Sequence, residues 1–185
     1  MKSLTGLLLY TCLWLFAGGG VAAVAQDSAE EERLLKAAFI YNFAKFTLWP
    51  EDAMGEAGAP FSLCIAGEDD LVDALVRLGG SQVKGRPLRI LSVKEARVPG
   101  RCQMLFVAAS EQRSYSDLLR SLRGRAILTV SELPRFASSG GVIELYRDHE
   151  RIRFVINLGI ARAAGLEISP SLLRLAAEVN QGQAP

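Results

Sequence analysis

The sequence predicts a single α/β domain, in which helices flank a mostly parallel sheet that ends in a C-terminal antiparallel hairpin. Apolar runs such as 102–109 are nearly continuous, which is typical of strands covered on both faces. Segments with helical spacing separate these runs, as in a sheet packed between helices. Strand-like residues 142–146 and 151–158 flank a polar turn, which indicates the hairpin. We find no internal repeat and no domain linker.

The first predicted helix is aromatic and amphipathic. Its apolar residues fall on one face at helical spacing: Leu35, Phe39, Phe43 and Phe46. We expect this face to pack on the sheet, although exposed aromatic residues that bind a partner are the alternative. Pro50 disfavours the helical region for Trp49, so the helix should end near Thr47 or Leu48.

The remaining elements alternate between strands and helices after a loop at 51–60. Strands are expected at 61–67, 86–93, 102–109 and 126–130, before the hairpin. Helices are expected after the acidic residues 68–70, after Ser110 or Ser114, at 131–136 as a short turn, at 159–164, and from Pro170. Acidic residues suit a helix start, and Ser169 followed by Pro170 is a typical N-terminal cap.

The N-terminus resembles a cleaved signal peptide. Met1 and Lys2 precede an apolar stretch at 4–16, and Ala23-Val24-Ala25 forms a cleavage signal of the Sec type. Removal of 25 residues from 185 leaves 160, which we assign to a domain at 26–180 and a disordered tail at 181–185. Export with an ordinary globular composition indicates the bacterial periplasm, an oxidising compartment.

The charge balance and the motifs exclude several functions. Without Lys2 the chain has 20 basic and 20 acidic residues, which argues against a nucleic-acid groove or an anionic-lipid patch. No sequence motif for a nucleophile, a metal or a phosphate loop occurs, and the lone histidine, His149, lies at the hairpin tip. We therefore predict no catalytic residues, no metal and no cofactor.

Two cysteines remain after removal of the signal peptide. Cys64 and Cys102 each lie in a strand-like apolar run. An even number in an oxidising compartment favours a disulfide over two buried thiols. The loop that it would close has about 38 residues, and the chain-entropy model assigns such a bond roughly 4 kcal/mol.

Two further features are candidates for binding. The turn of Ser138, Ser139, Gly140 and Gly141 could present its amides to an anion, or could simply be a permissive turn. In the last strand one face holds Ile152, Phe154, Ile156 and Leu158, and the other holds Arg151, Arg153, Val155 and Asn157. With Arg162 on the following helix, the second face is either a docking surface or a solvated face covered by a helix.

The order of several segments resembles the YfiR family of periplasmic proteins over nearly the whole mature chain. The segments are KAAFIYNFAKFTLWP, LCIAG, GRPLRIL, CQMLFVAASE, ILTVSELPRFASSGGVIEL and RIRFVINLGIARAAGLEISPSLLRLA. The resemblance implies a homodimeric repressor that binds the periplasmic sensing domain of an inner-membrane diguanylate cyclase and keeps cyclic-di-GMP low. It also implies relief by an outer-membrane lipoprotein that binds peptidoglycan.

The resemblance also assigns residues. Cys64 and Cys102 match the family's pair that bridges two core strands, and the hairpin at 142–158, with Ile143, matches a region linked to partner binding. Ala137 and Glu144 stand where some members carry a second cysteine pair. The alternative function is a small-ligand-binding module for a sensor kinase or transporter, in which the 138–141 turn and Arg153 hold an anion.

Overall fold

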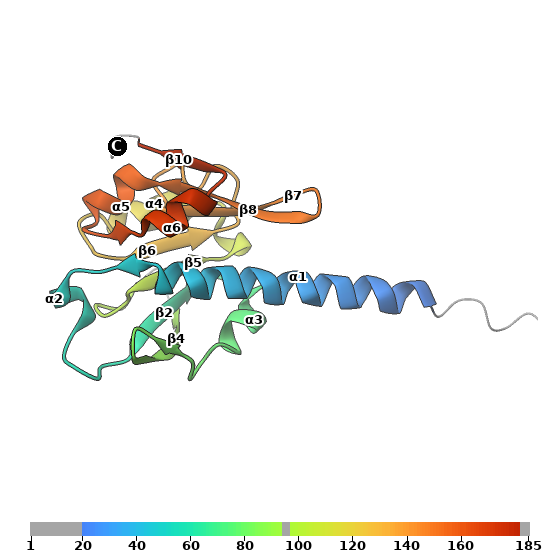
Figure 1. The fold of residues 1–185 in the computed structure, drawn as a ribbon, viewed down its shortest axis with the longest axis horizontal. Coiled ribbons are helices and arrows are strands. Elements are labelled where there is room, and N and C mark those ends of the chain that lie inside the picture. The colour runs from blue at the N-terminus through green and yellow to red at the C-terminus, as the bar shows by residue number, and fades with distance from the viewer. Residues whose placement is uncertain (1–19, 94–96, 182–185) are drawn as a thin grey trace, which may run out of the picture.

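A curled sheet organises the chain in the computed structural model, which describes residues 20–93 and 97–181 (Figure 1). Its strands are β2 (Phe61–Ala66), β3 (Gln82–Val83), β4 (Arg86–Val93), β5 (Met104–Val107), β6 (Leu128–Ser131), β7 (Ile143–Asp148), β8 (Arg151–Asn157) and β10 (Glu178–Asn180). A separate antiparallel pair joins β1 (Thr47–Leu48) to β9 (Glu167–Ile168). The helices are α1 (Gly20–Lys45), α2 (Glu51–Met54), α3 (Val72–Val76), the 3-10 helix η1 (Ala109–Glu111), α4 (Tyr115–Ser121), α5 (Leu158–Ala163) and α6 (Pro170–Leu175).

The strand order in the sheet is β10-β8-β7-β6-β5-β2-β4-β3. The five strands from β7 to β4 in this order are mutually parallel. β8 pairs antiparallel with β7, and β10 returns parallel to β8. The predicted fold class, a mostly parallel sheet with helices and a C-terminal antiparallel strand pair, is therefore confirmed.

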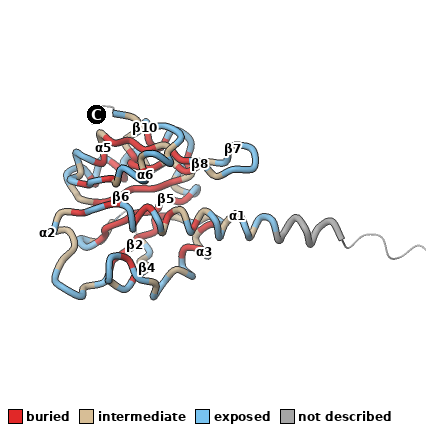
Figure 2. The backbone as a smooth tube through the Cα atoms, in the orientation of Figure 1, coloured by how far each residue is buried: buried red, intermediate tan, exposed pale blue. Residues whose placement is uncertain are grey.

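Strand alternation divides the interior into two hydrophobic cores. Phe61, Leu63 and Ile65 of β2 face one core together with α1, whereas Cys64 and Ala66 face the other. We call the first the α1 core, which also takes residues from α3, α5 and α6. We call the second the α4 core, in which the inner residues of α4 pack on β2 and β5. Figure 2 shows the buried backbone concentrated in the strands and the second half of α1.

The buried face of α1 differs from the predicted one. Leu35 and Phe46 are exposed, whereas Ile40 and Phe43 are fully buried. Two small residues, Ala37 and Ala44, complete the buried face. Small side chains let the helix approach the sheet closely. The buried face therefore keeps Phe43 from the predicted stripe, whereas the two ends of that stripe, Leu35 and Phe46, are exposed. Phe39 is half-buried, with its ring centroid 6.2 Å from that of Phe43 and 6.1 Å from that of Phe154.

Other expectations about local structure are corrected in the same way. Residues 131–136 form turns rather than a helical turn, because Ser131 ends β6 and its hydroxyl accepts the amide of Leu133 at 3.0 Å. The loop at 51–60 contains the short helix α2. The cap before α6 is confirmed, since the Ser169 hydroxyl accepts the amide of Leu172 at 3.2 Å.

The predicted signal peptide and tail lie largely outside the described residues. Only residues 20–25 of the former are described, as the start of α1, and only Gln181 of the latter. Within residues 20–93 and 97–181, no helix combines the length and the apolar composition needed to cross a bilayer.

Candidate interaction surface

The β7–β8 hairpin projects beyond the sheet and carries a charged tip (Figure 1). The turn is tight because His149 adopts a positive φ of 56°. The Arg147 guanidinium donates to the His149 carbonyl at 2.7 Å and lies 2.5 Å from the Glu32 carboxylate on α1. Arg153 pairs with Asp148 at 2.8 Å. The hairpin is therefore tethered to α1 by charge and is not packed into either core at its tip.

A charged cluster on α1 connects the helix to the sheet. The Lys36 ammonium lies 2.8 Å from the Glu32 carboxylate and 2.7 Å from that of Glu132, which follows β6. The hydrogen bond from Lys36, opposed by partial burial and helped by Arg147, lowers the pKa of Glu32. Burial acts to lower the pKa of Lys36, but the two carboxylates outweigh it and the pKa is raised. Glu32 and Lys36 are therefore both charged near neutral pH.

The two faces of β8 differ in burial, as the sequence predicts. Phe154 and Ile156 are buried against α1, and the Phe154 ring centroid is 4.9 Å from that of Phe43. On the other face Arg151 and Arg153 are exposed and Val155 is half-buried. Val155 lies in the interior of the sheet, between β7 and β10. This face is accessible at its tip end, and its role in binding a partner stays a prediction.

The expectation that Ile143 and Asn157 lie on an accessible surface is wrong. Ile143 is fully buried in the α1 core, opposite Ile156 of β8. Asn157 is buried because it caps α5: its side-chain oxygen accepts the Ile160 amide at 3.0 Å and its amide donates to the Ala137 carbonyl at 2.8 Å. Both side chains hold the fold together and are not free for a partner.

Arg162 is exposed on α5, where it reaches Gln181 at 3.4 Å. The strand β8 separates it from Arg151, and seven residues at about 3.3 Å each give roughly 20 Å between the strand's ends. The predicted residues therefore do not form one cluster.

Exposed apolar residues lie where α1 ends; the sequence left exposed aromatic residues open as an alternative but did not indicate which ones. Phe46 is 41% exposed and Leu48 is 53% exposed, while the residues between and after them, Thr47 and Trp49, are buried. The alternation of exposed and buried residues over 46–49 is typical of a strand. It was not recognised because these residues were assigned to the end of the first helix. The Phe46 carbonyl accepts the Ser169 amide at 2.9 Å, so this segment adjoins the start of α6.

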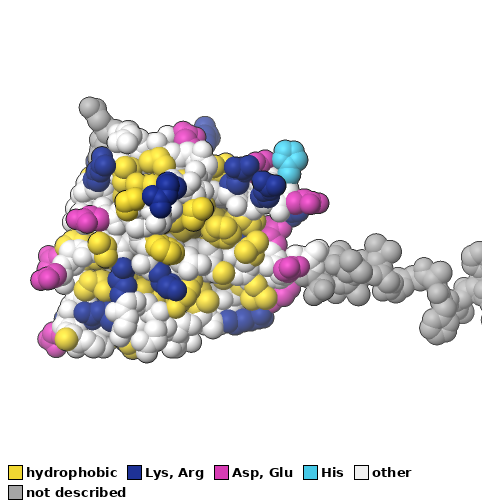
Figure 3. Space-filling model, viewed as in Figure 1, with side chains coloured by type: hydrophobic (Ala, Val, Ile, Leu, Met, Phe, Trp, Pro, Cys, Tyr) yellow, Lys and Arg dark blue, Asp and Glu magenta, His cyan; other side chains and the backbone are white. Residues whose placement is uncertain are grey.

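At the end of α6, Leu175 is 71% exposed. We call Phe46, Leu48 and Leu175 the α1–α6 face. Figure 3 shows hydrophobic side chains gathered over α1 and α6, with lysines and arginines among them. Exposed apolar side chains that gather in this way are typical of sites that bind another macromolecule.

The 138–141 turn serves packing more than anion binding. The amides of Ser139 and Gly141 both donate to the Phe136 carbonyl, at 3.2 Å and 2.9 Å, so they are used within the turn. Gly140 has a positive φ of 104°. A Cβ on Gly141 would lie 2.2 Å from the buried Phe136 ring. Arg153 pairs with Asp148 in the hairpin, and anion binding by the turn stays a prediction.

The predicted disulfide is present. It joins Cys64 of β2 to Cys102, two residues before β5, and both cysteines are buried in the α4 core. Among the residues that the structure describes, no group of three or more His, Cys, Asp or Glu could hold a metal ion. The family model described as YfiR/HmsC-like matches residues 33–177, which is most of the chain.

Proposed function

The chain belongs to the YfiR/HmsC-like family, and from that premise we propose that it binds and represses an inner-membrane diguanylate cyclase. Membership indicates a periplasmic regulator of cyclic-di-GMP signalling. The finer mechanism is our proposal: cleavage after Ala25 releases a domain that binds the cyclase's periplasmic sensing domain and lowers cyclic-di-GMP. An outer-membrane, peptidoglycan-associated lipoprotein competes for the regulator and relieves repression. We propose further that the regulator is a homodimer.

Repression by binding is a population shift. The regulator must bind the inactive state of the sensing domain more tightly than the active state, because equal affinity for both states shifts nothing. This task needs a surface and no reacting group. We accordingly propose that the protein is not an enzyme.

The observation that carries this proposal is the α1–α6 face. A few well-packed side chains near the centre of an interface supply most of its binding energy. Phe46 and Leu48 are large and solvent-exposed. Leu48 pairs with Glu167 of β9, and the Phe46 carbonyl accepts the Ser169 amide. Exposed arginines on β8, Arg151 and Arg153, lie elsewhere on the surface and would speed the encounter with an acidic partner.

The test replaces one exposed apolar residue at a time. We expect Phe46→Asp and Leu48→Asp each to weaken binding to the purified sensing domain by about 30-fold or more, as for a residue worth 2 kcal/mol. Calorimetry or surface plasmon resonance measures the affinity. In cells the same variants should raise cyclic-di-GMP toward the level of the gene deletion.

Val76→Asp is the matched control. Val76 is 52% exposed on α3 and lies far from Phe46. Its neighbour Arg77 pairs with Glu30 of α1. Glu30 precedes Phe46 by 16 residues, which is about 24 Å along a helix. This variant should bind normally. If all three variants bind like the wild type, the α1–α6 face is not the docking surface; if deletion leaves cyclic-di-GMP unchanged, the repressor function is wrong.

A further inference from the structure

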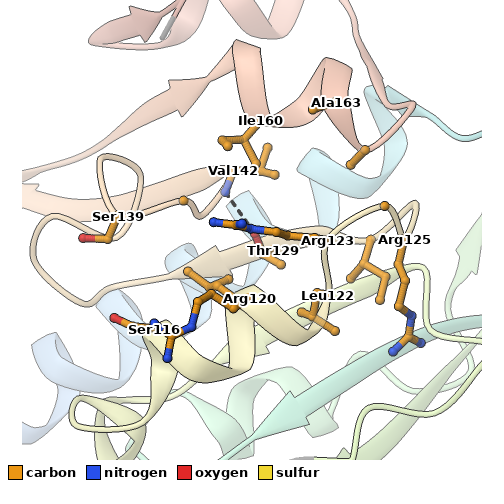
Figure 4. A pocket seen from close by; sticks show the side chains of 15 residues that line it. Ser116, Arg120, Leu122, Arg123, Arg125, Thr129, Ser139, Val142, Ile160 and Ala163 are labelled. Carbon is orange, nitrogen blue, oxygen red and sulfur yellow. Dashed lines mark hydrogen bonds between the residues drawn. The ribbon is translucent and has the colours of Figure 1, made fainter. Parts of the chain in front are cut away.

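A pocket of about 200 Å³ lies between α4, α5 and the 138–142 segment (Figure 4). Its floor is apolar, formed by Leu119, Leu122, Ile127, Val142 and Ile160. Serine hydroxyls of Ser116 and Ser139 and the small side chain of Ala163 lie in its wall. An apolar cavity of about 150 Å³ is enough to take up benzene, so this pocket has room for an apolar body of about six carbons and a polar group.

The charges around the pocket all have the same sign. Three arginines line it, Arg120, Arg123 and Arg125, and no aspartate or glutamate does. The whole chain has 21 basic and 20 acidic residues, so this is a local concentration of positive charge in a nearly neutral protein. An occupant of this pocket is therefore selected for negative charge.

The three arginines differ in their availability. Arg120 pairs with Asp117, and Arg125 donates to the carbonyls of Val98 and Pro99. The Arg123 guanidinium has no hydrogen bond or ion pair within the described residues. In Figure 4 the Arg123 side chain extends across the pocket, whereas the Arg125 guanidinium points away from it. Arg123 is thus the cation free to bind an anionic group at the mouth.

We propose that this pocket binds a small monocarboxylate with an apolar body, whose carboxylate pairs with Arg123 while its carbon chain lies on the floor. Planar guanidinium groups bind carboxylates through two parallel hydrogen bonds. The apolar floor favours a body of several carbons over a bare inorganic anion. The site is separate from the α1–α6 face, because none of Phe46, Leu48 and Leu175 lines the pocket.

Calorimetry with the mature chain and three probes tests the proposal. We expect hexanoate to bind, and hexan-1-ol, which lacks the charge, and acetate, which lacks the chain, to bind at least tenfold more weakly. Equal binding of hexanoate and hexan-1-ol would show that the pocket binds apolar molecules without any contribution from Arg123, which contradicts the proposal. Equal binding of hexanoate and acetate would reduce Arg123 to a surface ion site, and no binding of hexanoate would overturn the proposal outright.

Two variants locate the binding. Arg123→Ala should weaken hexanoate binding by about tenfold or more, the value of a charge-assisted hydrogen bond. Arg113→Ala, an exposed arginine outside the pocket, is its matched control and should change nothing. Ala163→Phe fills the mouth from the exposed side of α5 and should abolish binding without a loss of thermal stability. Retained affinity in both pocket variants would place hexanoate elsewhere and contradict the assignment.

Discussion

The two cores on opposite sides of the sheet are built differently. In the described part of the chain, the α1 core contains twenty-eight buried residues and has no covalent link, whereas the α4 core contains eleven and includes the disulfide. A small core buries less apolar surface and so stabilises less. The disulfide, which lies in that core, stabilises the folded domain as a whole by restricting the unfolded chain. This domain is therefore held by packing under α1 and by packing with a cross-link under α4.

The largest expected effect tests the α1 core. Phe43 is fully buried and packs on Phe154. Phe43→Ala should lower the free energy of unfolding by about 3–5 kcal/mol, because it removes an aromatic ring and leaves a cavity. Urea denaturation measures the change. Phe46→Ala, three residues along the chain and 41% exposed, is the control and should cost less than about 1 kcal/mol. Similar losses of stability for the two variants would mean that α1 is rotated so that Phe46 is buried as well as Phe43.

The second test breaks the cross-link of the α4 core. Replacing Cys64 and Cys102 together with alanine should lower the free energy of unfolding by about 2–4 kcal/mol, since the bond closes 38 residues of chain. A reducing agent should destabilise the wild type in the same way and leave the double variant unaffected. A wild type that unfolds identically with and without reductant would show that packing alone holds this side.

A third test overpacks the α4 core. Gly141→Ala places a methyl group against the ring of Phe136, which is itself buried and cannot move aside. We expect a loss of about 1–3 kcal/mol in thermal or chemical unfolding. Gly100→Ala has open space around the new methyl group and should stay within about 0.5 kcal/mol of the wild type. Equal stability of the two variants would show that the turn or the Phe136 ring shifts at little cost to make room for the methyl group.

The smallest effect concerns the ion pairs that tether the hairpin to α1. The lowered pKa of Glu32 means that its contribution is present above pH 4.5, the ordinary value, and is lost as pH falls through the folded-state pKa. Glu32→Gln should therefore destabilise by less than about 1 kcal/mol at pH 7, and the difference from wild type should shrink below pH 4.5.

Glu31→Gln, at an exposed neighbouring position, is the control and should change the free energy of unfolding by less than about 0.5 kcal/mol at pH 7. A constant difference between Glu32→Gln and the wild type from pH 7 to pH 3 would mean that the carboxylate of Glu32 adds nothing through its charge.

Several elements were predictable because their signals are local. The strands 61–66, 86–93 and 104–107 follow from continuous or alternating apolar runs, and the cap at Ser169 follows from its own hydroxyl and the next proline. The exposed face of Arg151 and Arg153 follows from a period of two along one strand. Each of these needs only neighbouring residues to be recognised.

Other features depend on partners far away in the chain. β1 and β9 are two residues long and exist because they pair with each other, and β10 exists because it pairs with β8. The burial of Ile143 depends on Ile156 across the hairpin and on α1 above it, so spacing alone left it ambiguous. The pocket beside Arg123 is built from three separate segments, and no one of them carries a motif.

The sequence by itself determined the α/β class, the cysteine pair and the polar and apolar residues of each long strand. Periodicity and composition can be recognised from a few neighbouring residues. The tertiary structure alone decided which residues of α1 face the sheet and which of the three pocket arginines has a guanidinium with no hydrogen bond or ion pair among the described residues. Those outcomes depend on shape and on competition among many contacts. Ala37 and Ala44 lie in the interior beside Phe43 because small side chains let the helix approach the sheet closely and pack densely.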